Sequence, residues 1–266
     1  MRYVKKIPFS YPELADLVGV QPLPTELESL IANLSKPDGS PLVREWFQPG
    51  SQYYGRRVSG EAAWRDIASG RMRYLDTGVE IVTSAGINGQ PTITMDGYRI
   101  FLPEPDATIN QEAGTFMFVF QHDGVSTGNR FLMGPSSGTA TATAAPSIYV
   151  TSTGLATRVG GGAGFQHNAT DYLNNIPKLI SVTLSATKGT SIRRNGVEVV
   201  RDTTRTLPLI SGLVYLFGAS GGAGTFKGYA GHALIFDDDM SKSEYIASLE
   251  KIEQGYLTAY GITPGA

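Results

Sequence analysis

Paired carboxylates are the first groups in this 266-residue chain that could perform chemistry. Glu104 and Asp106 stand two positions apart, so one strand would aim both into the same cleft. Retaining glycoside hydrolysis needs two carboxyl groups about 5 Å apart. Thr108 and Ile109 follow where a further glutamate would be needed, and the prolines on either side of Glu104 favour a loop. The sequence therefore predicts no glycosidase activity and no catalytic residues.

Histidines are the next groups that could bind a ligand, here a metal ion. His122, His167 and His232 are too far apart in the sequence to form a local metal-binding motif. We expect each to have a surface or structural role. The sequence therefore predicts no metal and no cofactor.

An acidic run, Asp237, Asp238 and Asp239, allows two interpretations. Carboxylates and turn carbonyl groups are ligands that calcium prefers. The run also stands directly before a predicted helix, where carboxylates bond free N–H groups and interact favourably with the helix dipole. We favour the helix-start role over a calcium site near Asp237.

Glycine-rich segments and aromatic side chains are the features that could form a binding surface. Residues 134–146, 160–164 and 218–224 are predicted to be loops, either flexible binding loops or plain connectors, and we favour connectors. They lack the spacing and context of phosphate-binding loops. Aromatic residues that could stack on sugar rings are more often core residues in such a protein. These aromatic residues are Tyr53, Tyr54, Trp64, Phe165 and Tyr172.

Composition excludes several classes of partner. The formal net charge is −2, from 22 basic and 24 acidic residues, which gives no long-range attraction to nucleic acid or to a membrane surface. The chain has no cysteine, so its stability comes from burial and backbone pairing. Pro8 and Pro12 interrupt the stretch after the basic first residues, and we therefore expect no export signal.

The elements that would position these residues change character near residue 87. Residues 1–86 contain three short helical patterns. Residues 26–34 follow a capping box at Thr25 and Glu28, a second pattern opens at Ser10, and residues 60–69 end at Gly70. Short amphipathic helices need another surface to cover their apolar side chains. We expect residues 1–86 to be a small, mainly helical or irregular region for docking or oligomerisation.

Residues 87–266 have the alternation that is typical of strands. Asn195 and Gly196 predict a two-residue hairpin turn, because both tolerate positive φ. Many short strands separated by turn residues indicate an all-β sandwich or barrel. The predicted strands are residues 92–95, 98–102, 115–121, 130–133, 147–152, 156–159, 179–184, 190–194, 197–201, 214–219 and 232–236.

The last 50 residues carry a family resemblance. A strand at residues 214–218 precedes a glycine-rich turn, then residues 226–231, a strand that ends at Phe236 and Asp237, and a closing helix with a Tyr260–Gly261–Ile262 tail. We expect Ser241 and Glu244 to cap that helix. This order resembles the end of a concanavalin A-like, laminin G-like jelly roll, and about two thirds of the chain is similar to that family. The resemblance implies a jelly-roll sandwich with a short C-terminal helix.

The resemblance also implies a context. Single domains of this family without a signal peptide are frequent in bacteriophage virions. We therefore expect a non-enzymatic virion structural protein, a capsid decoration or a tail or fibre component, assembled in the host cytoplasm. Its expected partners are other virion proteins and further copies of itself. The alternative is a carbohydrate-binding module that recognises a host-surface glycan; a glycosidase is the least favoured function.

Overall fold

The computed structural model describes residues 25–56, 59–75, 79–97, 101, 109–124, 128–135, 145–159, 165–204, 210–219 and 224–265. Several sequence predictions fall outside these residues. They are the helix opening at Ser10, most of the strand at residues 98–102, the Glu104 and Asp106 pair, the loop at residues 160–164, and most of the loops at residues 134–146 and 218–224.

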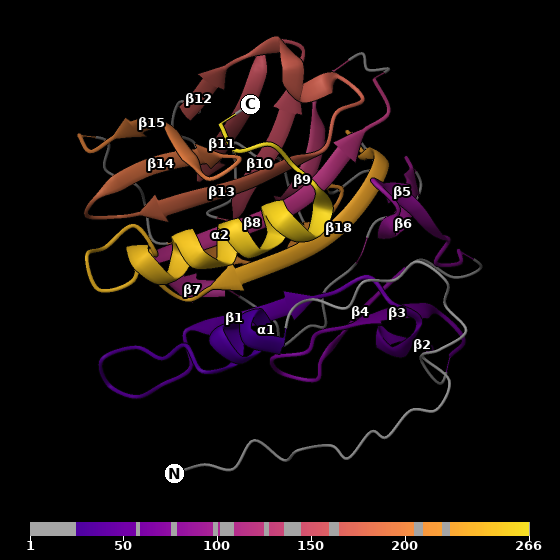
Figure 1. Cartoon of the computed structure of the whole chain (residues 1–266), viewed down its shortest axis with the longest axis horizontal. Coiled ribbons are helices and arrows are strands. Elements are labelled where there is room, and N and C mark those ends of the chain that lie inside the picture. Colours follow the sequence, from indigo (N-terminus) through magenta and orange to yellow (C-terminus); the bar gives the residue numbers. More distant parts are fainter. Residues whose placement is uncertain are drawn as a thin grey trace.

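Two antiparallel sheets form the body of the protein (Figure 1). The larger sheet has the order β15 (Val197–Asp202), β14 (Gly189–Arg194), β13 (Lys178–Ser185), β8 (Ala113–His122), β18 (Lys227–Phe236), β6 (Gln90–Asp96) and β5 (Thr83–Ile87). Strand β1 (Val43–Phe47) also pairs with β18. The second sheet has the order β12 (Phe165–Asn168), β11 (Gly154–Val159), β10 (Pro146–Thr151), β9 (Arg130–Pro135) and β17 (Val214–Leu216). The predicted all-β sandwich is confirmed.

Smaller elements surround the two sheets. One small sheet contains β2 (Tyr54–Arg56), β3 (Ala62–Arg65) and β4 (Met72–Tyr74), and another pairs β7 (Ile109–Gln111) with β16 (Ile210–Gly212). Among the described residues, the helices are α1 (Thr25–Ala32) and α2 (Ile246–Tyr260), with 3-10 turns η2 (Ser51–Tyr53) and η3 (Thr170–Leu173). In the described part of the chain, no helix is long and apolar enough to cross a membrane.

Strand β8 shows how the core is arranged. Phe116, Phe118 and Phe120 belong to the main core that joins the two sheets. Met117 and Val119 alternate with them and belong to a second core that includes buried residues of α1 and α2. Both faces of β8 are therefore buried, and this explains its nearly continuous apolar sequence.

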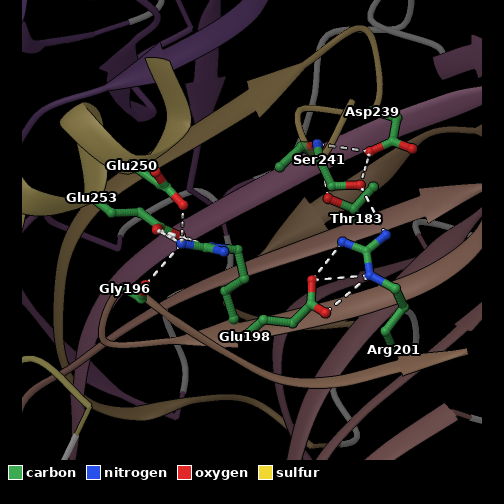
Figure 2. A network of polar contacts seen from close by, with 10 residues as sticks. Thr183, Gly196, Glu198, Arg201, Asp239, Ser241, Glu250 and Glu253 are labelled. Carbon is green, nitrogen blue, oxygen red and sulfur yellow. Dashed lines mark hydrogen bonds and ion pairs between the residues drawn. The ribbon is translucent and has the colours of Figure 1, made fainter. Parts of the chain in front are cut away.

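Helix α2 lies across the larger sheet (Figure 1) and is attached to it by a buried charge. Glu253 is 1% exposed and receives bonds from Arg193 Nε at 3.0 Å and from Ser181 Oγ at 2.7 Å. Figure 2 shows Glu253 and Glu250 of the helix facing the hairpin that carries Gly196. A buried carboxylate requires such partners, so these bonds fix where the helix lies on the sheet.

The described part of residues 1–86 is packed into the sandwich. Strand β1 pairs with the C-terminal half of β18, and the division expected after residue 86 falls inside the β5–β6 hairpin. Trp64 of β3 is fully buried, with its ring centroid 5.1 Å from those of Phe47 and Phe101. The docking or oligomerisation role of this region stays a prediction.

A buried ion pair links the small β2–β3–β4 sheet to both larger sheets. Arg73 Nε donates to Glu45 Oε2 at 2.7 Å, and Arg73 Nη2 donates to Glu45 Oε1 at 3.0 Å. Arg73 Nη1 also donates to the carbonyl of Val214 at 2.5 Å. Both charged side chains are at most 5% exposed. The bidentate geometry and the extra acceptor supply the partners that a buried guanidinium needs.

The helix predicted at residues 60–69 is wrong, whereas the helix at residues 26–34 is confirmed as α1. Residues 62–65 form strand β3, which pairs with β2 and β4. Asp66 then accepts the backbone N–H groups of Ala68 and Ser69, which closes a tight turn. Gly70, with φ +76°, ends that turn. A glycine with positive φ also ends helices, and this shared signal caused the error.

The predicted start of the C-terminal helix is also wrong. Helix α2 begins at Ile246, and Ser241 lies in the preceding turn. Asp239 Oδ1 accepts both the N–H of Ser241, at 2.8 Å, and its hydroxyl, at 2.6 Å. The aspartate has therefore taken the acceptor role that was expected of the serine. The helix end is as expected, because Gly261 adopts the left-handed conformation directly after Tyr260.

We expect Arg73→Met to lower the free energy of unfolding by about 3–5 kcal/mol, because Glu45 would remain buried without its cation. Arg56→Met is the matched control, since the Arg56–Glu80 pair is more than half exposed and should contribute little. Urea denaturation of the full chain measures both effects. Equal losses in the two variants would show that the buried pair does not anchor the small sheet.

We also expect acid to destabilise the protein through His232. This side chain contacts Tyr260 and is fully enclosed, and burial lowers its pKa from 6.5 to about 3. Between these values the unfolded chain binds a proton that the folded chain does not, so stability is complete above pH 6.5 and falls as the pH drops. The contribution is about 1.4 kcal/mol per pH unit. His232→Gln should flatten the dependence of unfolding free energy on pH between 4 and 6.5, and an unchanged slope would contradict this assignment.

Candidate functional site

The three histidines are each held by different neighbours. His122 packs against Phe226, while His167 bonds Tyr172 and His232 bonds Tyr260. Within the described residues, no group of three or more histidine, aspartate or glutamate side chains could hold a metal ion. The structural interpretation of these histidines is the one that the contacts support.

The acidic run before α2 is fully engaged in the fold. Asp237 pairs with Arg44 at 3.2 Å, and Asp238 pairs with Lys242 at 2.7 Å. Asp239 is 1% exposed and accepts bonds from Ser241. Figure 2 shows Asp239 pointing at Ser241. These bonds are those of a turn that ends before α2 begins at Ile246, so the run does not cap the helix as the favoured interpretation expected.

The aromatic residues considered for sugar stacking lie in the core or against it. Trp64 and Tyr172 are fully buried and Phe165 is 8% exposed. Tyr53 and Tyr54 are partly buried and pack against the same core. Trp64, Phe165 and Tyr172 are therefore core residues as expected, whereas Tyr53 and Tyr54 lie at the border of the core.

A pocket of about 440 Å³ opens where three strands of the larger sheet end, and we call it the strand-end pocket. Its walls come from the end of β6, the start of β18, the turn after β8 and the segment after η3. Because β18 lies between β6 and β8, these four segments meet at one end of the sheet. The lining residues are Thr94, Met95, Asp96, Asp123, Asn175, Lys227, Gly228 and Tyr229.

Close backbone contacts at Gly228 bring two walls of the strand-end pocket together. Gly228 has φ +131°, and a Cβ placed there would lie 2.1 Å from the carbonyl oxygen of Gln121. Glycine is therefore required at this point of β18. Lys227 and Tyr229 flank it on the same face of the strand, because side chains alternate.

Two further glycines position those flanking side chains. A Cβ at Gly97 would lie 2.8 Å from Cε of Lys227, so the lysine chain passes directly over this residue. A Cβ at Gly86 would lie 2.2 Å from Cδ1 of Tyr229, so the tyrosine ring rests on the backbone of β5. Both side chains therefore pack directly against the backbone of a neighbouring glycine.

Asn175 and Asp123 form the opposite wall of the strand-end pocket. Gln121 Nε2 donates to Asn175 Oδ1 at 2.5 Å, and this bond orients the amide group. A Cβ at Gly124 would lie 3.8 Å from the backbone nitrogen of Asn175, so the turn after Asp123 packs against this segment. Both Asp123 and Asn175 are solvent-exposed.

Buried polar contacts hold the segment that carries Asn175. Arg194 Nη1 donates to both carboxylate oxygens of Asp171, at 2.8 and 2.9 Å. Lys178 Nζ donates to Asn174 Oδ1 at 3.1 Å, and Lys178 is 2% exposed. Burial lowers the pKa of Lys178, and the charge of Asp171 partly opposes that shift. The segment is thus held by the buried Lys178 and by Arg194, whose partner Asp171 has a side chain that is 38% exposed.

A second, smaller pocket of about 320 Å³ lies beside the β2–β3 hairpin. Arg56 Nη2 donates to both oxygens of Glu80, at 2.7 and 2.6 Å. Tyr54, in the same lining, accepts the backbone N–H of Gly50 at 3.0 Å. Arg56 and Glu80 therefore bond each other, and we take the larger strand-end pocket as the candidate for a ligand.

Sequence reasoning did not identify the strand-end pocket. Lys227 and Tyr229 belong to residues 226–231, whose pattern indicates the fold but predicts no binding role. Four segments contribute to the pocket, from Thr94 to Tyr229, and no local pattern in the sequence predicts that they lie together. The alternation of Lys227 and Tyr229 around a glycine at the start of a strand is the one sequence signal that points to it.

Comparison of the sequence with protein families and with curated proteins finds no match. Solved structures do show a similar fold. The binding domain of Paraclostridial Mosquitocidal Protein 1 is similar with a TM-score of 0.57 and 14% identity, over 81% of this chain and 52% of that chain. The ligand-binding domain of botulinum neurotoxin serotype D, in complex with N-acetylneuraminic acid, gives a TM-score of 0.55 at 8% identity, over 80% and 50%.

A structure of botulinum neurotoxin type C, whose cell entry is described as dependent upon interaction with two ganglioside molecules, gives a TM-score of 0.54 at 10% identity, over 80% of this chain and 51% of that chain. The chain therefore spans about half the length of these similar structures. At such low identity the likeness shows the fold, an all-β sandwich shared with toxin binding domains.

We expect Gly228→Ala to distort the strand-end pocket and to lower the melting temperature, because the new methyl group would overlap the Gln121 carbonyl. Gly60→Ala is the matched control, since Gly60 also has positive φ, +102°, but nothing within 4 Å of a Cβ. An alanine at positive φ costs about 1–3 kcal/mol in either variant, so Gly228→Ala should lose more unfolding free energy than the control. Thermal unfolding of both variants measures the difference, and equal shifts would mean that the close approach does not matter.

Proposed function

We propose that this protein is a non-enzymatic glycan-binding protein that holds its ligand in the strand-end pocket. The observation that carries the proposal is the composition of this pocket. It combines carboxylates, an oriented amide, an ammonium group and a tyrosine at one end of a sandwich. Sugar hydroxyl groups both donate and accept hydrogen bonds, and they need both kinds of partner side by side.

The geometry suits a sugar ring in two respects. Asp96 and Asp123 offer acceptors, while Lys227 and Asn175 offer donors, so hydroxyl groups find complementary partners across the pocket. Tyr229 adds an aromatic ring, whose faces suit the C–H face of a pyranose. A volume of about 440 Å³ lies within the usual range for small-molecule sites.

The comparisons support this proposal through the fold. Two similar structures are described by the glycans with which they interact, N-acetylneuraminic acid and gangliosides. The fold of this chain therefore matches about half of two chains that are described as interacting with glycans. The non-enzymatic part of the proposal rests on the sequence, in which the Glu104 and Asp106 pair lacks a further glutamate.

The virion context expected from the sequence remains a separate proposal. It rests on the resemblance to a family that is frequent in bacteriophage particles. A glycan-binding sandwich is compatible with that context, because a displayed domain that binds a host-surface glycan would serve attachment. The concanavalin A-like class, the virion partners and the homo-oligomer stay predictions.

We expect the full chain to bind at least one glycan on a surface that presents diverse oligosaccharides. Asn175→Ala and Asp123→Asn should each weaken that binding about tenfold, because the first removes a hydrogen bond to the ligand and the second replaces a charge-assisted bond by a weaker neutral one. Asn168→Ala and Glu112→Gln are matched controls, since both residues are exposed and lie outside the pocket lining, and should bind normally. Binding to no glycan, or binding that survives both pocket substitutions, would contradict the proposal.

A further inference from the structure

We infer that Gln121 is a positioning residue of the strand-end pocket, which turns the amide nitrogen of Asn175 toward the ligand, so that the glycan presents a hydrogen-bond acceptor at this point. This inference rests on the proposed glycan-binding function and adds what the pocket requires of the sugar. It is carried by one bond, in which Gln121 Nε2 donates to Asn175 Oδ1 at 2.5 Å.

The larger sheet fixes Gln121 behind the strand-end pocket. Gln121 is 8% exposed and is not among the lining residues. In β8 it is the cross-strand partner of Tyr229 of β18. Its carbonyl oxygen fills the space that Gly228 leaves, 2.1 Å from where a Cβ would lie. The point from which the Gln121 side chain reaches Asn175 is therefore set by strand pairing.

Asn175 is placed by its backbone, whereas the direction of its amide needs a further partner. Lys178 Nζ donates to Asn174 Oδ1 at 3.1 Å, and the turn at Gly124 packs against the backbone nitrogen of Asn175. These contacts leave two orientations of the Asn175 amide, because the last torsion of an asparagine side chain is roughly two-fold. One orientation turns the oxygen toward the ligand, and the other turns the nitrogen.

The bond from Gln121 decides between these two orientations. An asparagine amide has one oxygen that accepts and one nitrogen that donates. Because the Asn175 oxygen accepts from Gln121, the nitrogen is left for the ligand. Within the part of the chain that the structure describes, this is the one hydrogen bond of the Asn175 side chain. Turning the Asn175 amide over would place two NH2 groups against each other.

The orientation of Asn175 limits which sugar groups fit beside it. A hydroxyl oxygen or the carbonyl oxygen of an acetamido group can accept from Asn175, whereas a group that only donates cannot. A donor that is already oriented loses little conformational entropy when the ligand binds. A ligand without an acceptor at this point leaves the Asn175 donors unpaired in the complex, which weakens binding. Gln121 therefore acts on specificity through Asn175.

The first test needs no ligand. Exchange of the side-chain amide protons with water is followed by NMR in the 15N-labelled full chain. We expect at least one Gln121 Nε2 proton to exchange slowly, because it is bonded and buried, and both Asn175 Nδ2 protons to exchange fast, because Asn175 is exposed. An Asn175 proton that exchanges as slowly as this Gln121 proton would show the opposite orientation and overturn the inference.

The second test reverses the bond with Gln121→Glu. At pH 8 the new carboxylate only accepts, so it draws the Asn175 nitrogen away from the ligand. The probes are the methyl glycosides of glucose, galactose, mannose and N-acetylglucosamine, titrated by ligand-observed NMR. We expect the best-bound probe to bind about tenfold more weakly than to the wild type. Binding should recover toward the wild-type value as the pH falls to 5, because a protonated carboxyl group donates again.

Two further variants separate this role from charge and from packing. Gln254→Glu adds the same charge at an exposed position of α2 outside the lining, and it should bind as the wild type does at both pH values. Gln121→Met keeps a similar length but removes the bond, and its binding should be weakened without recovery in acid. Thermal unfolding of each variant shows that it is folded.

Undiminished binding by Gln121→Glu at pH 8 would overturn the inference while the proposed function stands. A loss that acid does not reverse in the folded variant would overturn it too, since a proton restores a donor but not a packing defect. If the wild type binds neither these probes nor any surface-presented oligosaccharide, the proposed function fails. The exchange measurement then still decides how the Asn175 amide is turned.

Discussion

Hydrogen bonding along both edges of β18 is the constraint on which the core and the candidate site both depend. One edge pairs with β8, with a register shift between Ala230 and Ala233. The other edge pairs first with β6 and then with β1. The strand therefore joins the start of the described chain to its end. Its first residues line the strand-end pocket, and its last residue precedes the turn into α2.

Buried charges add specificity to this arrangement of sheets. The Glu45–Arg73 pair ties the small β2–β3–β4 sheet to β1 and β17, and the Glu253–Arg193 pair ties α2 to the larger sheet. Apolar surfaces alone would allow each element to slide, because the hydrophobic effect has no direction. A buried ion pair fixes one position, because leaving either charge without its partner is costly.

The sequence predicted the elements whose signals are local. Asn195 and Gly196 adopt positive φ values of 47° and 81° in the β14–β15 hairpin, as their side chains favour. Strands β8, β13 and β14 were predicted because apolar and β-branched residues dominate them. Strand β1 and the small β2–β3–β4 sheet were not predicted. Residues far away in the sequence bury the side chains of this sheet, as Phe101 and Phe217 do for Trp64.

The candidate site was beyond local prediction for the same reason. Asp96, Asp123, Asn175 and Lys227 come from four separate segments, and only the order of strands in the sheet brings them together. The cations that hold the segment of Asn175, Lys178 and Arg194, lie on β13 and β14. A pattern that is read along the chain records none of these distances.

Mapping the bound glycan onto the backbone tests the central claim most directly. Amide chemical shifts of the labelled full chain would be followed while a glycan that it binds is added. The account predicts that the largest changes fall on residues 94–96, 123–124, 174–176 and 227–229, which line or adjoin the strand-end pocket. Changes concentrated instead around Tyr54, Arg56 and Glu80, in the second pocket, would contradict it.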